Sequence, residues 1–183
     1  GLPRSGTSMM MRILDKGGVP VLTDNIRKAD KDNLKGYYEF ERVKHLDTDT
    51  GWLCEAEGKA VKIISALLKE LPRDHEYKVI FMDRDIDEVL ASQRKMMERR
   101  GEEIQGIPDE VMRGIFEKHL REVKGWLMER KIETLYVNYN DVLEDPLGNV
   151  QRVNKFLSWE LDVEKMTKVV DPDLYRQRSE QLP

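Results

Sequence analysis

The feature that most constrains this chain is a glycine-framed loop, residues 1–8 (GLPRSGTS), which runs directly into an apolar-faced helical segment. Glycines let the backbone approach a ligand closely, and the helix behind the loop presents N–H groups and a positive dipole. Laid over the nucleotide P-loop pattern G-x-x-x-x-G-K-[ST], the loop matches at Gly1, Gly6 and Ser8. Thr7 stands where the pattern has its lysine. The loop therefore predicts a phosphate site, and favours a donor other than a nucleoside triphosphate.

Composition limits the class of protein. The 183 residues, of which 39% are hydrophobic and 36% charged, predict one globular domain over residues 1–183. A formal charge of −4 argues against a general nucleic-acid binder. No apolar run approaches the ~20 residues that a membrane span requires.

Cysteine and histidine usage argues against disulfide and metal frameworks. The single cysteine, Cys54, cannot form an internal disulfide and fits a reducing compartment, so we expect a cytoplasmic location. The three histidines, His45, His75 and His119, have no ligand-like spacing with each other or with Cys54. We therefore expect no metal site.

The order of hydrophobic patterns predicts strands alternating with helices. The clearest strand is residues 77–82, followed by a helix over 85–100 that begins with the capping-box pattern Asp85-x-x-Glu88. A second long helix begins at Pro108, a strand covers 133–137, and a helix follows Asp145-Pro146. Weaker patterns predict the following elements: a helix over 8–16, strands over 19–22 and 59–64, a helix over 36–46, a helical turn over 66–71, a loop over 101–108, a loop or short turn over 139–143 and a polar tail over 171–183.

This alternation predicts an α/β fold, a three-layer P-loop NTPase-like domain with a mostly parallel central sheet. A phosphate loop normally follows a buried strand, so we expect an apolar first strand upstream of Gly1, outside this sequence. In such sheets ligands bind at the carboxyl ends of the strands. Both the loop and Arg84 are expected at such ends.

Two arginines and a serine form the candidate anion site. Arg4 lies inside the loop and Arg84 follows the 77–82 strand, and the two positions can bind two separate phosphates. Ser92 lies eight positions after Arg84, two turns into the next helix. Arginine supplies a forked donor and serine a further hydrogen bond, so both can hold one phosphate.

These segments together resemble the sulfotransferase family, in its bacterial-type branch. Residues 3–8 look like the family's 5′-phosphosulfate loop, and Arg84 to Ser92 resembles its 3′-phosphate motif. Residues 139–146 (YNDVLEDP) are similar to its Tyr-Glu-Asp-Leu segment. The resemblance implies the donor 3′-phosphoadenosine 5′-phosphosulfate (PAPS, product PAP), with no metal. It also implies sulfuryl transfer to a hydroxyl or amine of a small-molecule, glycan or peptide acceptor.

The resemblance assigns donor contacts residue by residue. Arg84 and Ser92 would grip the 3′-phosphate, and Tyr139 would lie near the adenine, although a core tyrosine is an equally good interpretation of that position. The 5′-phosphosulfate would be held by the loop residues, with Arg4 stabilising the charge that develops on the bridging oxygen: Arg4, Ser5, Gly6, Thr7 and Ser8.

The catalytic base does not carry over from the family pattern. The cytosolic branch has a Val-Lys-Thr-His stretch, and the comparable residues 61–64 here are VKII, so the histidine position is apolar. Lys62 remains and would stabilise the transferring group. By analogy with other branches, Glu39 or Glu41 is the candidate that takes the acceptor's proton, and a solvated helix face is the competing interpretation of both. His75 and His119 are further candidates that the sequence places less well, and core packing is the better interpretation of His119.

Two alternative functions stay open. A P-loop small-molecule kinase has the same architecture, but Thr7 in place of the lysine disfavours it. A non-catalytic nucleotide-binding protein of the same fold is the second alternative, because the base is unresolved. The acceptor is built by loops whose sequence does not encode it, and oligomeric state is equally unreadable.

Overall fold

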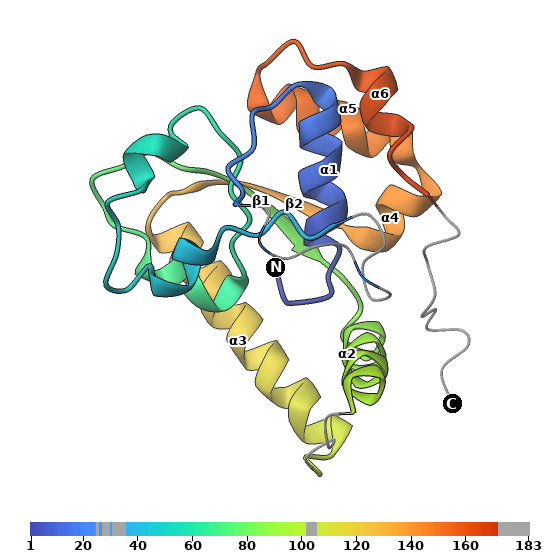
Figure 1. Ribbon diagram of the computed structural model, residues 1–183. Coiled ribbons are helices and arrows are strands. Elements are labelled where there is room, and N and C mark those ends of the chain that lie inside the picture. Colours follow the sequence, from blue (N-terminus) through green and yellow to red (C-terminus); the bar gives the residue numbers. More distant parts are fainter. Residues whose placement is uncertain (25, 27–29, 31–35, 102–105, 172–183) are drawn as a thin grey trace.

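The structure is a computed structural model that describes residues 1–24, 26, 30, 36–101 and 106–171 (Figure 1). Most of the polar tail predicted over 171–183 and part of the loop after Gly101 lie outside these residues. The described part contains two strands, six α-helices and three 3-10 helices, in this order: α1 Thr7–Gly17, η1 Glu41–His45, η2 Leu53–Ala56, η3 Ser65–Glu70, β1 Lys78–Asp83, α2 Ile86–Arg100, α3 Asp109–Glu129, β2 Glu133–Asn138, α4 Tyr139–Glu144, α5 Pro146–Leu157 and α6 Val163–Thr167.

The two strands confirm the α/β class with a small parallel sheet. β1 pairs with β2 in parallel, from Lys78 opposite Glu133 to Asp83 opposite Asn138. The crossover between them contains α2 and α3, as parallel pairing requires. Both strands lie where their apolar runs predict them. Because the register ends at Asp83 and Asn138, the residues that follow both strands leave the sheet at the same edge.

The strands predicted over 19–22 and 59–64 are wrong within the described residues. They meet only in an isolated parallel bridge between Val21 and Ala60. The hydrogen bonds of this bridge run from Leu22 N to the Ala60 carbonyl (2.9 Å) and from Ala60 N to the Pro20 carbonyl (2.8 Å). Proline has no N–H to donate, so Pro20 cannot extend the ladder.

Each face of the sheet carries a separate hydrophobic core, because successive strand residues point to opposite sides. Met82 packs in one cluster with residues of α1, α4, α5 and α6. Phe81 packs in the other, with residues of η1, η3 and α3. Figure 1 shows α1, α5 and α6 gathered on one side of the strands and α3 on the other. No helix among the described residues is long and apolar enough to cross a membrane.

Two short segments differ from their predictions. The helix expected over 36–46 is only the 3-10 helix η1, because Tyr38 has a left-handed φ of 52° and Phe40 is extended. The loop or short turn expected over 139–143 is the helix α4. Its first turn is capped by the Asn138 side chain, which accepts from Asn140 N and Asp141 N. A short helix after 157, α6, was not predicted.

The two long helices follow their sequence signals. α2 begins after Asp85, whose side chain accepts from Asp87 N and Glu88 N. α3 begins directly after Pro108, but only its C-terminal half is buried. On the apolar stripe Val111 is 52% exposed whereas Val123 is 0% exposed. The stripe therefore marks a core-facing surface correctly only along the last turns of α3.

The two valines provide a matched test of this difference. We expect Val123→Ala to lower the free energy of unfolding by about 2 kcal/mol, through lost burial and the cavity left behind. Val111→Ala makes the same change on the same helix, and should alter the free energy by less than about 0.5 kcal/mol. Equilibrium denaturant unfolding of both variants measures the difference. Equal losses would contradict the burial described here.

Candidate anion-binding site

The glycine-framed loop is closed by local hydrogen bonds and two left-handed residues. Ser5 N donates to the Leu2 carbonyl at 3.2 Å, and Ser5 Oγ donates to the same oxygen at 2.7 Å. Arg4 has φ 72° and Gly6 has φ 89°, and α1 begins at the next residue, Thr7. Alternation of handedness in a turn directs backbone N–H groups into one concavity, the usual geometry for an anion. Ser5 therefore shapes the loop with both its N–H and its hydroxyl.

Gly6 is required by packing as well as by its φ angle. A Cβ atom built on Gly6 would lie 2.4 Å from Cδ2 of Tyr139. The tyrosine ring, at the start of α4, thus packs directly against the loop backbone. The P-loop pattern does not predict this contact between the loop and α4.

The structure brings Arg4, Arg84 and Ser92 into one cluster. Arg4 Nε donates to Ser92 Oγ at 3.0 Å, and Arg84 Nη1 donates to the Arg4 carbonyl at 3.0 Å. The two arginines come from loops at the N-termini of α1 and α2, the positions at which helix dipoles favour anions. The sequence treats them as two separate phosphate positions, whereas here they adjoin.

Arg84 is held on three sides. Its side chain is 7% exposed and pairs through Nε with Oε2 of Glu88 at 2.9 Å; the Glu88 side chain is 0% exposed. The guanidinium carbon lies 4.4 Å from the centre of the Tyr139 ring, a cation–π contact. Burial raises the pKa of the Tyr139 hydroxyl, with Arg84 lowering it and Glu88 raising it. One face of this ring is thus in contact with Arg84, which makes Tyr139 a support for the arginine.

Lys62 and Glu39 form a second polar cluster at the start of α1. Lys62 Nζ donates to the Tyr37 carbonyl at 2.7 Å, to Ser8 Oγ at 3.3 Å and to Glu39 Oε1 at 3.3 Å. The lysine side chain is 9% exposed and that of Glu39 is 27% exposed. Ser8 Oγ also donates to the Tyr37 carbonyl at 3.3 Å. The cluster joins the phosphate loop to the segment before η1.

Glu41, the other carboxylate singled out by sequence, has a different partner. It accepts from Lys44 Nζ at 2.8 Å, in an exposed pair within η1. Of the two histidines farther along the chain, His119 lies 2.9 Å from Ser65 Oγ, and burial lowers its pKa. The described residues contain no group of three or more His, Cys, Asp or Glu arranged to hold a metal.

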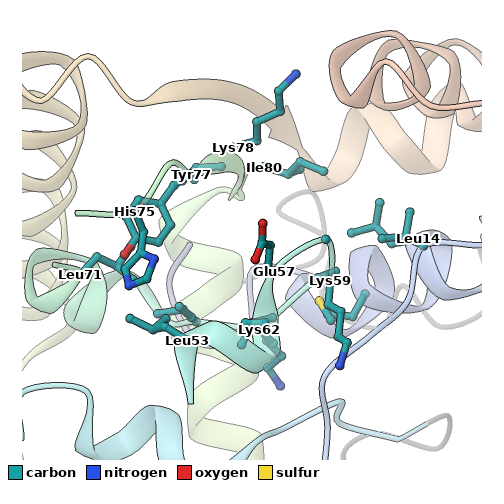
Figure 2. Close-up of a pocket in the computed structure, with 18 of the residues that line it drawn as sticks. Leu14, Leu53, Glu57, Lys59, Lys62, Leu71, His75, Tyr77, Lys78 and Ile80 are labelled. Carbon is teal, nitrogen blue, oxygen red and sulfur yellow. The ribbon is translucent and has the colours of Figure 1, made fainter. Parts of the chain in front are cut away.

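A cavity of about 720 Å³ is lined in part by Lys62, and sequence reasoning did not anticipate it. Figure 2 shows its lining, with Glu57, Lys59 and Lys62 from one segment and Lys78 and Ile80 from β1. Apolar side chains of α1, including Leu14, complete the wall. A cavity that forms between distant segments has no local sequence signal.

Sequence reasoning also missed Glu88 and Asn140. Asn140 Nδ2 donates to Glu88 Oε1 at 3.2 Å, while the other oxygen of the carboxylate binds Arg84. The capping-box pattern assigns Glu88 a role at the helix start, yet its carboxylate connects α2 with α4. The spacing Arg84 to Glu88, four residues, was the available signal for the ion pair.

Comparison with known proteins decides the family. A protein-family model described as "Sulfotransferase domain" matches residues 1–176. The chain belongs to the sulfotransferase family. The matched range contains the phosphate loop, the Arg84–Ser92 segment and the Tyr139 segment, the three regions from which the resemblance was argued.

A curated sulfotransferase is distantly similar to the chain. It is sulfotransferase 2B1 of Homo sapiens, 23% identical over 181 residues, an alignment that covers 92% of this chain and 47% of the relative. The chain therefore spans about half the length of the curated relative that it matches. No solved structure matches.

The contact between the sulfotransferase loop and Tyr139 is testable with two glycine variants. Gly58 also has a positive φ, 68°, but a Cβ there would meet nothing within 4 Å. We expect Gly58→Ala to cost about 1 kcal/mol of unfolding free energy, from the backbone alone. Gly6→Ala should cost clearly more, because the methyl group displaces the Tyr139 ring. Thermal unfolding compares the two, and equal costs would show that the ring does not press on the loop.

Proposed function

We propose that the protein is a sulfotransferase, which moves the sulfuryl group of PAPS to an acceptor hydroxyl or amine. The observation that carries this proposal is the convergence of Arg4, Arg84 and Ser92 beside a phosphate loop in a chain of this family. Arg84 and Ser92 come from one turn-helix unit and Arg4 from another. Anion sites of this kind use arginine forks and hydroxyl donors together.

The residues present fit such a donor. Arg84 and Ser92 would hold the 3′-phosphate, and the 5′-phosphosulfate would lie against the N–H groups that begin α1, with Arg4 between the two anions. The first N–H groups of a helix have no acceptor within the helix, so they can donate to a ligand. Tyr139, which the resemblance places near the adenine, would contribute by supporting Arg84.

The Lys62–Glu39 cluster suits the transfer step. When bound, the donor supplies an activated sulfuryl group. Glu39 would accept the proton that the acceptor's hydroxyl or amine loses as its oxygen or nitrogen bonds to sulfur, while the bond from sulfur to the bridging oxygen of the donor breaks and PAP leaves. Lys62, fixed by Ser8 and the Tyr37 carbonyl, would stabilise negative charge at the start of α1. Glu39 is the better of the two candidate bases because its partner Lys62 also contacts Ser8 of the loop, whereas Glu41 pairs with Lys44 within η1.

We also propose the complete three-layer P-loop arrangement. Both faces of the β1–β2 pair are covered, which supports it. The bacterial-type branch, the metal-free reaction, the small-molecule, glycan or peptide acceptor and the cytoplasmic location remain predictions from the sequence.

The two alternatives make different demands on the site. A kinase of this architecture would use a lysine at the position of Thr7 and a metal-bound triphosphate. Arg4 and Ser92 in contact favour a bound phosphate that is separate from the transferred group. A non-catalytic binding protein would keep the Arg84 cluster and dispense with Lys62 and Glu39, so transfer assays distinguish it from an enzyme.

Donor binding tests the anion site. We expect Arg84→Ala to raise the Kd for PAP, the desulfonated donor, by about 100-fold or more, because a buried charge partner of the 3′-phosphate is lost. Arg113→Ala is the matched control. Arg113 pairs with Asp87 of α2, the helix that also carries Glu88, the partner of Arg84, but the Arg113 side chain is exposed. Isothermal titration calorimetry measures both. An Arg84→Ala protein that binds PAP like the unmodified chain would exclude this site.

Sulfuryl transfer tests the second cluster. With labelled PAPS and a panel of hydroxyl and amine acceptors, we expect Glu39→Gln to lower kcat by about 10²–10⁴-fold, the usual contribution of a general base. Its Kd for PAP should change little. Glu41→Gln in the same assay separates the two candidate bases. If transfer fails with every acceptor while PAP binds tightly, the protein is the non-catalytic alternative.

A further inference from the structure

A buried carboxylate lies inside the proposed anion site. Glu88, in the first turn of α2, has a side chain that is 0% exposed. One of its oxygens accepts from Arg84 Nε at 2.9 Å and the other from Asn140 Nδ2 at 3.2 Å. Both oxygens are therefore engaged, by residues from two different segments of the chain.

This placement needs a physical reason. Removing a carboxylate from water is costly, and a negative charge next to a phosphate site opposes the ligand by Coulomb repulsion. An anion site built for charge alone would have a neutral residue at position 88. What the carboxylate provides is geometry, since Arg84 is a planar fork that must be aimed before it can bind a phosphate with two N–H groups.

The contacts around Arg84 fix the plane of the guanidinium. Glu88 holds the Nε edge, the Arg4 carbonyl accepts from Nη1, and the Tyr139 ring lies 4.4 Å from the guanidinium carbon. Asn140, the residue after Tyr139, holds the second oxygen of Glu88. The ring that supports the guanidinium and the amide that anchors its carboxylate thus come from consecutive residues of α4.

We propose that Glu88 and Asn140 are positioning residues, which hold Arg84 in the orientation that receives the donor's 3′-phosphate. This inference rests on the proposed function. Asn140 anchors the carboxylate, and Glu88 anchors the guanidinium, so the two act in series. Neither residue needs to touch the donor. Their effect is to make binding depend on the 3′-phosphate, the group that distinguishes PAP from adenosine 5′-monophosphate (AMP).

Glu88→Gln separates positioning from charge, because the two predict opposite signs. Glutamine has nearly the same shape but is neutral and has a single acceptor oxygen, so it loses the charge-assisted bond that holds Arg84. A positioning role predicts that the Kd for PAP rises by about tenfold or more, while the Kd for AMP changes less than about threefold. If Glu88 acts only as a repelling charge, its neutralisation should make PAP bind more tightly.

A matched control comes from α6. Glu164 and Lys168 form an ion pair four residues apart, as Glu88 and Arg84 do. The side chains of Glu164 and Lys168 are both exposed, whereas those of Glu88 and Arg84 are buried. Glu164→Gln should leave the Kd values for PAP and AMP unchanged. Titration calorimetry with both ligands, on proteins whose thermal unfolding has been checked, measures the PAP-to-AMP affinity ratio. Merely structural damage lowers both affinities and leaves this ratio unmoved.

Asn140→Ala keeps the proposal testable if Glu88→Gln does not fold. It leaves the ion pair in place and removes only the anchor of the second oxygen, so we expect a smaller loss of PAP affinity, about three- to fivefold. In the double variant the two losses should not add, since they act in series. An unchanged PAP-to-AMP ratio in both single variants overturns the positioning role.

The same titrations distinguish this failure from failure of the proposed function. If the unmodified protein binds PAP no better than AMP, the site does not recognise a 3′-phosphate, and the proposed function and this inference fail together. If the unmodified protein prefers PAP and Glu88→Gln keeps that preference or strengthens it, only the positioning role is lost.

Discussion

The buried guanidinium of Arg84 is the contact on which the rest of the site depends. It joins the phosphate loop through the Arg4 carbonyl, α2 through Glu88 and α4 through the Tyr139 ring. The parallel pairing of β1 and β2 makes this possible. Because Asp83 lies opposite Asn138, the next residue on each strand emerges at the same sheet edge, which places Arg84 beside Tyr139. The fold thus assembles the site through strand register.

The parts of this arrangement that sequence predicts are those with local signals. The β1 strand, the Asp85 cap and α2 follow from a continuous apolar run, a capping residue and helical spacing. The phosphate loop is recognisable because the glycine spacing and the helix start behind it both favour binding of an anion. Arg84 and Ser92 could be selected because both lie on one turn-helix unit, eight positions apart.

The unpredicted parts depend on partners that are distant in sequence. Glu88 looks like a capping residue until α4 supplies Asn140, 52 positions away. The 59–64 segment has a strand-like composition, but its neighbour contains Pro20 and cannot continue a ladder. Lys62 gained a partner in Glu39 that no spacing rule connects. Local propensity proposes such elements, and long-range contacts decide what they become.

Charge balance explains why affinity at the proposed anion site depends on the orientation of hydrogen-bond donors more than on net charge. The chain has a formal charge of −4, so its overall field opposes a polyanionic donor. Salt screens that field over about 8 Å at physiological ionic strength, so the opposing effect is weak at close range. Within that distance Glu88 offsets the charge of Arg84, and Glu39 offsets the charge of Lys62. Affinity for the donor must then arise from N–H groups that are oriented toward its phosphates. A buried carboxylate with both oxygens bonded, such as Glu88, can fix the orientation of Arg84, and an exposed carboxylate cannot.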